Sequence, residues 1–148
     1  MTHKRISLAA VGCALVIGCE PASAFTFSDG KSAGCYANGT LVPEALLDAP
    51  PVELSFTGKT IRAESGYRIV WNEKKLNSLP PEMHDFIFFH ECAHAKIDTV
   101  DETMANCAGL KDMREAGRAG PQVEAKLAAF YGPGNAYWAR TLKCANGG

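Results

Sequence analysis

The chain has 148 residues, of which 47% are hydrophobic and 21% are charged, and its formal net charge is −1. This length suits a single domain with a hydrophobic core. The ordinary charge content argues against a disordered chain, and the near-zero net charge argues against nucleic-acid binding, which needs a basic surface. Six cysteines are the unusual feature, and they raise the question of the compartment in which the protein folds.

The first 24 residues have the pattern of a secretory signal peptide. Lys4 and Arg5 precede a run of 14 uncharged residues, and Ala22-Ser23-Ala24 forms an A-x-A cleavage site. The uncharged run is too short for a membrane span, which needs about 20 residues. Cleavage after Ala24 would leave a single mature domain of residues 25–148. We therefore expect an exported protein, either periplasmic or secreted.

A lipoprotein is the alternative interpretation of this segment. Val16-Ile17-Gly18-Cys19 resembles a bacterial lipoprotein box, in which Cys19 would be acylated and would anchor the protein to a membrane. Both interpretations export the domain, and an oxidising compartment favours disulfides. The four remaining cysteines are therefore expected to form two disulfides. These cysteines are Cys35, Cys92, Cys107 and Cys144.

The predicted elements of the domain indicate an α+β fold with a small β-hairpin or sheet first and helices after it. Residues 25–51 are rich in Gly, Pro and Ala, which is typical of irregular structure. Two β-prone runs, Ser55–Ala63 and Tyr67–Trp71, flank a short turn and suit a hairpin. Residues 72–79 suit a polar loop. We expect three or four helices, over about residues 81–97, 99–115, 121–131 and 136–144.

The residues with recognisable chemistry lie in the first predicted helix. His90-Glu91-Cys92-Ala93-His94 is an H-E-x-x-H motif. His90 and His94 are one helical turn apart, so both imidazoles project from the same face and can share one ion. Zn²⁺ suits such nitrogen ligands. Glu91 lies about 100° round the helix, where it can reach a water beside the metal without ligating the metal.

A third protein ligand is needed if a water is to occupy the fourth position of the metal. Positions 97 and 100 hold Ile97 and Val100, so the longer H-E-x-x-H-x-x-G-x-x-H pattern is absent. Glu102, early in the second predicted helix, is the best candidate for the third ligand. Asn106 lies one turn further on the same face and could orient a histidine through a hydrogen bond.

Glu102 also has an alternative structural role. Thr99 and Glu102 have the spacing of a capping box at a helix N-terminus, which would explain the glutamate without a metal. Asp98 and Asp101 are the rival carboxylates for the third ligand position. Asp98 lies one turn beyond His94 but is expected to fall in the turn between the two helices.

These motifs resemble the gluzincin group of zinc metallopeptidases, in which a glutamate in an E-x-x-A-D-like setting follows H-E-x-x-H on a later helix. The matching residues are Glu102, Ala105 and Asn106, and the resemblance covers about residues 81–110. It departs from the group's pattern in three ways. Asn106 stands where Asp is more usual, Lys96 adds a charge just past the second histidine, and the gap between the motifs is short.

The resemblance implies a minimal zincin-like catalytic core. His90, His94 and Glu102 would be the zinc ligands, and Glu91 would be the general base that takes a proton from the attacking water. The substrate would be a peptide or protein. The strand Tyr67–Trp71 would run along the cleft, where it could bind an extended peptide by strand addition.

Two further questions stay open at this point. The donor that stabilises the developing oxyanion has four candidates, which are Tyr67, His84, Tyr131 and Tyr137. The activity itself has an alternative, because a domain this small offers little material for a deep cleft. That alternative is a non-catalytic zinc-binding or partner-binding module that retains the metal site.

The disulfide pairing also stays open. Cys92 lies about 180° round the helix from the two histidines, so we do not expect it to be a metal ligand. A Cys92–Cys107 bond would link the two predicted metal-bearing helices, but Cys92 faces away from the second of them. Cys92–Cys35 and Cys92–Cys144 therefore remain the live alternatives for this cysteine.

Overall fold

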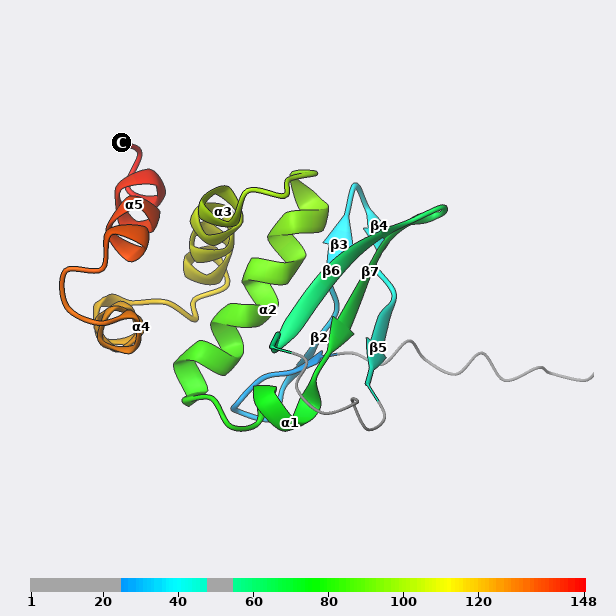
Figure 1. Ribbon diagram of the computed structural model, residues 1–148, viewed down its shortest axis with the longest axis horizontal. Helices are drawn as coiled ribbons and strands as arrows, with labels where there is room; N and C mark the ends of the chain where they lie inside the picture. Colours follow the sequence, from blue (N-terminus) through cyan, green and yellow to red (C-terminus); the bar gives the residue numbers. More distant parts are fainter. Residues whose placement is uncertain (1–24, 48–54) are drawn as a thin grey trace, which may run out of the picture.

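The computed structural model describes residues 25–47 and 55–148, and the predicted signal segment, with Cys19, lies outside this range. The described part has small sheets first and helices after them, as expected for an α+β domain (Figure 1). The strands are β1 (Phe25–Thr26), β2 (Ser32–Ala33), β3 (Tyr36–Ala37), β4 (Thr40–Leu41), β5 (Glu44–Leu46), β6 (Gly58–Ala63) and β7 (Gly66–Trp71). The helices are α1 (Glu73–Leu76), α2 (Pro81–Lys96), α3 (Glu102–Glu115), α4 (Pro121–Tyr131) and α5 (Ala136–Ala145).

The sheets confirm the predicted hairpin and correct the interpretation of the segment before it. β6 and β7 pair antiparallel, with Ala63 opposite Gly66, and form a three-stranded sheet in the order β5-β7-β6. β5 adds to this sheet parallel to β7, and β1–β2 and β3–β4 are two short hairpins. Residues 25–47 are therefore not irregular as predicted. Their strands are only two or three residues long, too short for a periodic pattern to be visible.

The helices follow the predicted boundaries with two corrections. The loop predicted over residues 72–79 contains the short helix α1, which Asn72 caps by accepting a hydrogen bond from the backbone of Lys75. This makes five helices in the described residues, one more than the upper prediction. α3 begins at Glu102 and not near Thr99, because the Asp101 carboxylate caps it by accepting from the Met104 backbone at 2.8 Å.

Helix α2 is the central element of the fold. It begins at Pro81, whose ring suits the first turn of a helix. It lies between the β6–β7 hairpin and α3, and α5 packs against the far side of α3 (Figure 1). Phe86, Phe88 and Phe89 are buried within these layers. Covered on both sides, α2 can hold polar side chains at fixed positions, as a functional site requires.

Close contact between α2 and α3 depends on Gly109. A Cβ at this position would lie 2.9 Å from the backbone nitrogen of His90 and 2.9 Å from the carbonyl carbon of Phe89. Any larger residue would push α3 away from α2 at the first histidine of the motif. The glycine therefore brings the two helices close enough for their side chains to share one site.

Two disulfides crosslink the packed elements of the fold. Cys35 bonds to Cys92 and joins the N-terminal strands to α2, and Cys107 bonds to Cys144 and joins α3 to α5. The first is one of the two pairings left open for Cys92, and a Cys92–Cys144 bond is not formed. The linked residues are 57 and 37 positions apart. Each crosslink should stabilise the fold by about 4 kcal/mol on a chain-entropy estimate.

None of the helices in the described residues is long and apolar enough to cross a membrane.

Candidate metal centre

Helices α2 and α3 bring the three predicted metal ligands together. The Nε2 atoms of His90 and His94 lie 3.2 Å apart. The Oε2 atom of Glu102 lies 3.1 Å from the Nε2 of His90 and 3.6 Å from that of His94. The i, i+4 spacing on α2 places the histidines on one face, and the first turn of α3 supplies the glutamate. These residues form the cluster that could hold a metal ion in the described part of the chain.

The other ring nitrogen of each histidine donates a hydrogen bond to an oxygen. His90 Nδ1 lies 2.6 Å from the side-chain oxygen of Asn106, and His94 Nδ1 lies 2.8 Å from the backbone carbonyl of Thr99. Both oxygens can only accept, so both Nδ1 atoms carry the proton. The Nε2 atoms therefore present lone pairs to the centre of the cluster, as in metal-binding histidines.

The orientation of Asn106 is itself fixed by a buried chain of hydrogen bonds. Asn106 is 1% exposed, and Thr141 of α5 is fully buried beside it. The Thr141 hydroxyl donates to the carbonyl of Tyr137 at 3.2 Å, so its oxygen accepts from the amide nitrogen of Asn106 at 3.4 Å. This arrangement directs the carbonyl oxygen of Asn106 towards His90. Helix α5 thus helps to set the tautomer of a histidine on α2.

When both imidazoles are neutral and protonated at Nδ1, three electron pairs converge at this point. Two neutral Nε2 atoms and one carboxylate oxygen would repel each other at 3.1–3.6 Å unless positive charge lies between them, either a metal ion or a proton on one imidazole. Ligand atoms held about 2.1 Å from one tetrahedral ion lie about 3.4 Å from each other. The three observed separations bracket this value. The donor set of two imidazoles and one carboxylate fits Zn²⁺.

The electrostatics of the cluster also favour positive charge. Burial lowers the pKa of His90, but the Glu102 hydrogen bond, the charges of Glu91 and Glu102, and Asn106 outweigh it, so that the pKa lies above its usual value. The contact with His90, whose Nε2 donates to Glu102 when the imidazole is protonated, lowers the pKa of Glu102, and this effect outweighs the opposing effect of burial. A carboxylate that stays ionised next to two imidazoles is the charge state that a divalent cation needs.

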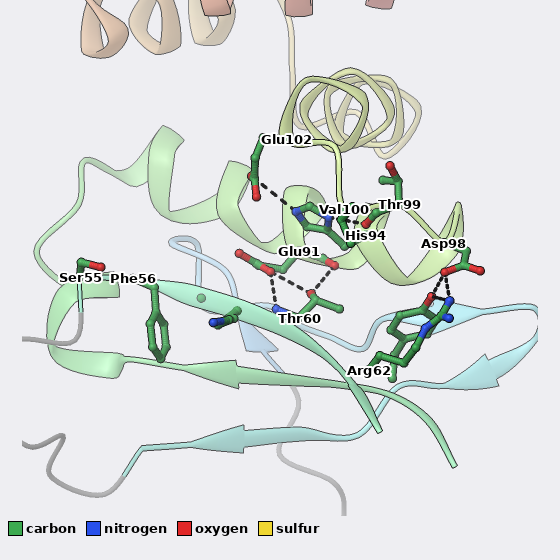
Figure 2. Close-up of a pocket in the computed structure, with 13 residues that line it drawn as sticks. Ser55, Phe56, Thr60, Arg62, Glu91, His94, Asp98, Thr99, Val100 and Glu102 are labelled. Carbon is green, nitrogen blue, oxygen red and sulfur yellow. Dashed lines mark hydrogen bonds and ion pairs between the residues drawn. The ribbon is translucent and has the colours of Figure 1, made fainter. Parts of the chain in front are cut away.

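Glu91 lies beside the cluster with its carboxylate held by the neighbouring strand. It is 7% exposed, and its Oε2 accepts hydrogen bonds from the backbone nitrogen of Thr60 at 2.7 Å and from the Thr60 hydroxyl at 2.8 Å. Figure 2 shows Glu91, His94 and Glu102 facing the same space, with Thr60 of β6 next to Glu91. The carboxylate is thus fixed near the ligands without joining them.

These residues line a cleft of about 860 Å³ between β6 on one side and α2 with the start of α3 on the other. At one end of the cleft, Arg62 and the hydroxyl of Tyr67 both donate to the carboxylate of Asp98, in the turn after α2 (Figure 2). At the other end lie Ser55 and Phe56. The volume is within the range of small-molecule and peptide sites, so the domain is not too small for a substrate cleft.

The strand that borders the cleft is β6, which corrects the prediction for Tyr67–Trp71. β7 is the central strand of its sheet, and its edges are already paired with β5 and β6. The backbone of Asn72 donates to Thr57, so the alternating residues Gly58, Thr60 and Arg62 direct their peptide groups away from β7. β6 is therefore an edge strand whose outer edge faces the cleft, and one group of that edge, the Thr60 N–H, donates to Glu91.

The structure gives other contacts to the rival carboxylates, Asp98 and Asp101, and does not form the capping box predicted for Glu102. Thr99 does not cap α3, because Asp101 does, so the predicted Thr99–Glu102 capping box is not formed. Asp101 is occupied as this cap, and Asp98 pairs with Arg62 and Tyr67. Of the three carboxylates considered, Glu102 is the one that lies against the histidines.

The four candidate oxyanion donors lie at different distances from the cluster, with Tyr131 and Tyr137 near Glu102 and His84 away from it. His84 lies 3.1 Å from Asp85 and packs against Phe25. Tyr137 donates to the backbone carbonyl of Glu102 at 3.1 Å, and burial together with nearby negative charge raises its pKa to about 12. Tyr131 stacks on Trp138, and its hydroxyl lies beside the Asn106 side chain and close enough to Glu102 to feel its charge. Among these four, Tyr67 is the one that lines the cleft.

Two residues of the site were not predicted from the sequence. Thr60 holds Glu91, and Thr141 holds Asn106. Each lies more than 30 positions along the chain from its partner, and threonine is common in strands and helices alike. No local pattern marks either residue, although the hairpin prediction does place Thr60 in a strand.

Comparison of the chain with family models, with curated proteins and with solved structures finds no match.

Proposed function

We propose that the protein is an exported zinc-dependent peptidase of gluzincin-like type, with His90, His94 and Glu102 as zinc ligands and Glu91 as general base. The observation that carries the proposal is the convergence of two imidazole lone pairs and one carboxylate oxygen at 3.1–3.6 Å. A buried fourth residue, Glu91, faces the same cleft and is separately held. A purely structural metal site would normally be closed by a fourth protein ligand.

Bound zinc would act as a Lewis acid, lowering the pKa of a water and polarising the substrate carbonyl. Glu91 accepts the proton of the attacking water and passes it to the leaving amine. Thr60 supports this role because its backbone N–H and hydroxyl keep the Glu91 carboxylate in one orientation. Asn106 and the Thr99 carbonyl keep both imidazoles in the tautomer that binds a metal.

The cleft-facing edge of β6 supports a peptide as the substrate. An extended chain could pair with the peptide groups of Gly58 and Arg62, on either side of the Thr60 N–H that holds Glu91, and would then run along the cleft past Glu91. Arg62 lines the same cleft, and the guanidinium N–H groups that it does not use on Asp98 and Tyr67 offer hydrogen-bond donors to a substrate oxygen.

The alternative is a zinc-binding or partner-binding module without turnover. One observation favours it: an oxygen of the Glu91 carboxylate is occupied by two donors from Thr60. Zinc binding is common to both proposals, whereas hydrolysis belongs to the first alone.

The test of the proposed function begins with metal content. We expect one zinc per chain in protein prepared without chelator, and we expect removal of the zinc to lower the melting temperature and to abolish hydrolysis of a peptide library. Both should return on adding zinc, because a ligand that binds only the folded state stabilises it. Protein that folds fully and takes up no zinc would contradict both functions.

A second test concerns the residue that orients His90. We expect Asn106→Ala to weaken zinc binding by about 10–100-fold, which is typical of removing an outer partner of a metal ligand. Asn106→Asp should retain most of the affinity, because its carboxylate still accepts from Nδ1. Competition with a chromogenic chelator measures both affinities. Equal zinc affinity in the Ala variant and the wild type would show that Asn106 does not position the ligand.

A further inference from the structure

Glu44 is a buried carboxylate with no part in the proposed zinc site. It lies on β5 and is 9% exposed. One oxygen accepts a hydrogen bond from the indole nitrogen of Trp71 at 2.8 Å, and the other accepts from the backbone nitrogen of Cys35 at 3.4 Å. The backbone nitrogen of Phe25 donates to the same carboxylate.

None of these three donors carries a charge. Burial raises the pKa of Glu44, and the hydrogen bonds from Trp71, Cys35 and Phe25 only partly offset this effect. No ion pair of Glu44 is found in the part of the chain that the structure describes. An ionised carboxylate at this depth is costly unless a cation lies beside it.

The backbone nitrogen of Phe25 is in the right place to become that cation. The Phe25 side chain is 4% exposed, and its ring centroid lies 5.0 Å from that of Trp71 and 5.0 Å from that of Phe88. These contacts hold the nitrogen beside Glu44. In the sequence, Phe25 directly follows Ala22-Ser23-Ala24, the predicted cleavage site.

We propose that cleavage after Ala24 converts this hydrogen bond into a buried ion pair between the new α-ammonium group of Phe25 and the carboxylate of Glu44. A signal-peptidase-type endopeptidase and one water supply the chemistry. The Ala24–Phe25 peptide bond breaks, Ala24 keeps the new carboxylate, and Phe25 keeps an amine that is largely protonated at neutral pH. The inference depends on neither zinc binding nor hydrolysis by this protein.

The proposed Phe25–Glu44 ion pair is connected to the cleft through the side chain of Trp71. A Cβ on Gly58 would collide with the Trp71 ring and would lie 2.9 Å from the Glu91 side chain. The Trp71 ring therefore lies against the strand position next to Glu91, while its nitrogen is bonded to Glu44. Charge-assisted hydrogen bonds are stronger than neutral ones. An ammonium group on Phe25 would therefore hold Glu44 and Trp71 more rigidly than the neutral amide does before cleavage.

The test uses the full 148-residue precursor, exported by a bacterial host, and a second precursor with one serine inserted after Ala24. Mass spectrometry should find Phe25 as the first residue of the first protein and serine before Phe25 in the second. In the second protein the Phe25 nitrogen remains an amide and cannot be charged. Each protein is then made with Glu44 and with Glu44→Gln, and urea unfolding is measured for all four.

We expect Glu44→Gln to lower the folding equilibrium constant of the protein that starts at Phe25 by about a hundredfold or more, because a buried charge loses its partner. In the serine-extended protein the same substitution should change it little or raise it, because a buried charge without a partner is removed. If Glu44→Gln lowers the folding equilibrium constant equally in the protein that starts at Phe25 and in the serine-extended protein, the proposal is overturned. A mature protein that starts at Cys19 or elsewhere would overturn it too.

A second measurement covers the case in which Glu44→Gln does not accumulate. An amine-reactive reagent should label the Phe25 amine of the native protein at least tenfold more slowly than that of the urea-unfolded protein. Labelling at the same rate in both states would overturn the proposal. Neither measurement involves zinc or hydrolysis, so failure here is separate from failure of the proposed function.

Discussion

Replacing Glu91 with glutamine is expected to lower hydrolysis of a peptide substrate by about 10²–10⁴-fold, the usual contribution of a general acid–base residue. Glutamine has the shape of glutamate, and its amide oxygen can still accept the hydrogen bonds of Thr60. It cannot take up and return a proton. The loss should therefore appear in kcat, and the zinc content and the melting temperature should stay close to those of the wild type.

The matched control is Glu115→Gln, at the exposed C-terminal end of α3. It makes the same chemical change outside the cleft and should leave both hydrolysis and zinc content unchanged. If the wild type cleaves peptides and Glu91→Gln cleaves them equally well, Glu91 is not the base and the peptidase proposal fails. If the wild type binds zinc but cleaves no peptide in a broad library, the non-catalytic module is supported instead.

Replacing Glu102 with alanine is expected to weaken zinc binding by several orders of magnitude. The Glu102 carboxylate is the charged member of the cluster and lies 3.1 Å and 3.6 Å from the two Nε2 atoms. The loss should exceed the 10–100-fold change expected for Asn106→Ala, because a ligand is removed and not its outer partner. Zinc titration against a competing chelator gives the affinities.

The matched control is Asp101→Ala, one position earlier. Asp101 caps α3 through Met104, so its loss should lower the free energy of unfolding by about 1 kcal/mol while zinc affinity is retained. If the two variants gave this result in reverse, Asp101 would be the ligand and Glu102 would have a structural role only. Hydrolysis should fall with zinc content in the Glu102 variant.

The features that depend on neighbouring residues can be predicted from the sequence, whereas the features that depend on residues far apart in the chain cannot. The helix carrying His90 and His94 was predicted to within one residue of its end, because proline at the start, helical periodicity and i, i+4 spacing are local properties. The β6–β7 hairpin was predicted for the same reason. The small strands before residue 48 were missed, since two or three residues carry no period.

The sequence predicts two members of the His90–His94–Glu102 cluster by local spacing and the third only among alternatives. His90 and His94 follow from spacing alone, whereas Glu102 had two rival carboxylates and an alternative role as part of a helix cap. The structure brings Glu102 to the histidines because Gly109 lets α3 approach α2 and because Asp101 starts α3 at position 102.

By itself, the sequence determined the α+β class, the H-E-x-x-H helix, the hairpin and the presence of four cysteines in the domain. Only the tertiary structure decided which cysteines pair, which strand borders the cleft, which side chains hold Glu91 and Asn106, and that Phe25 meets Glu44. The physical reason is distance along the chain. Periodicity, caps and turns report contacts within a few residues, whereas Thr60 with Glu91, Cys35 with Cys92 and Phe25 with Glu44 meet only after the layers have packed.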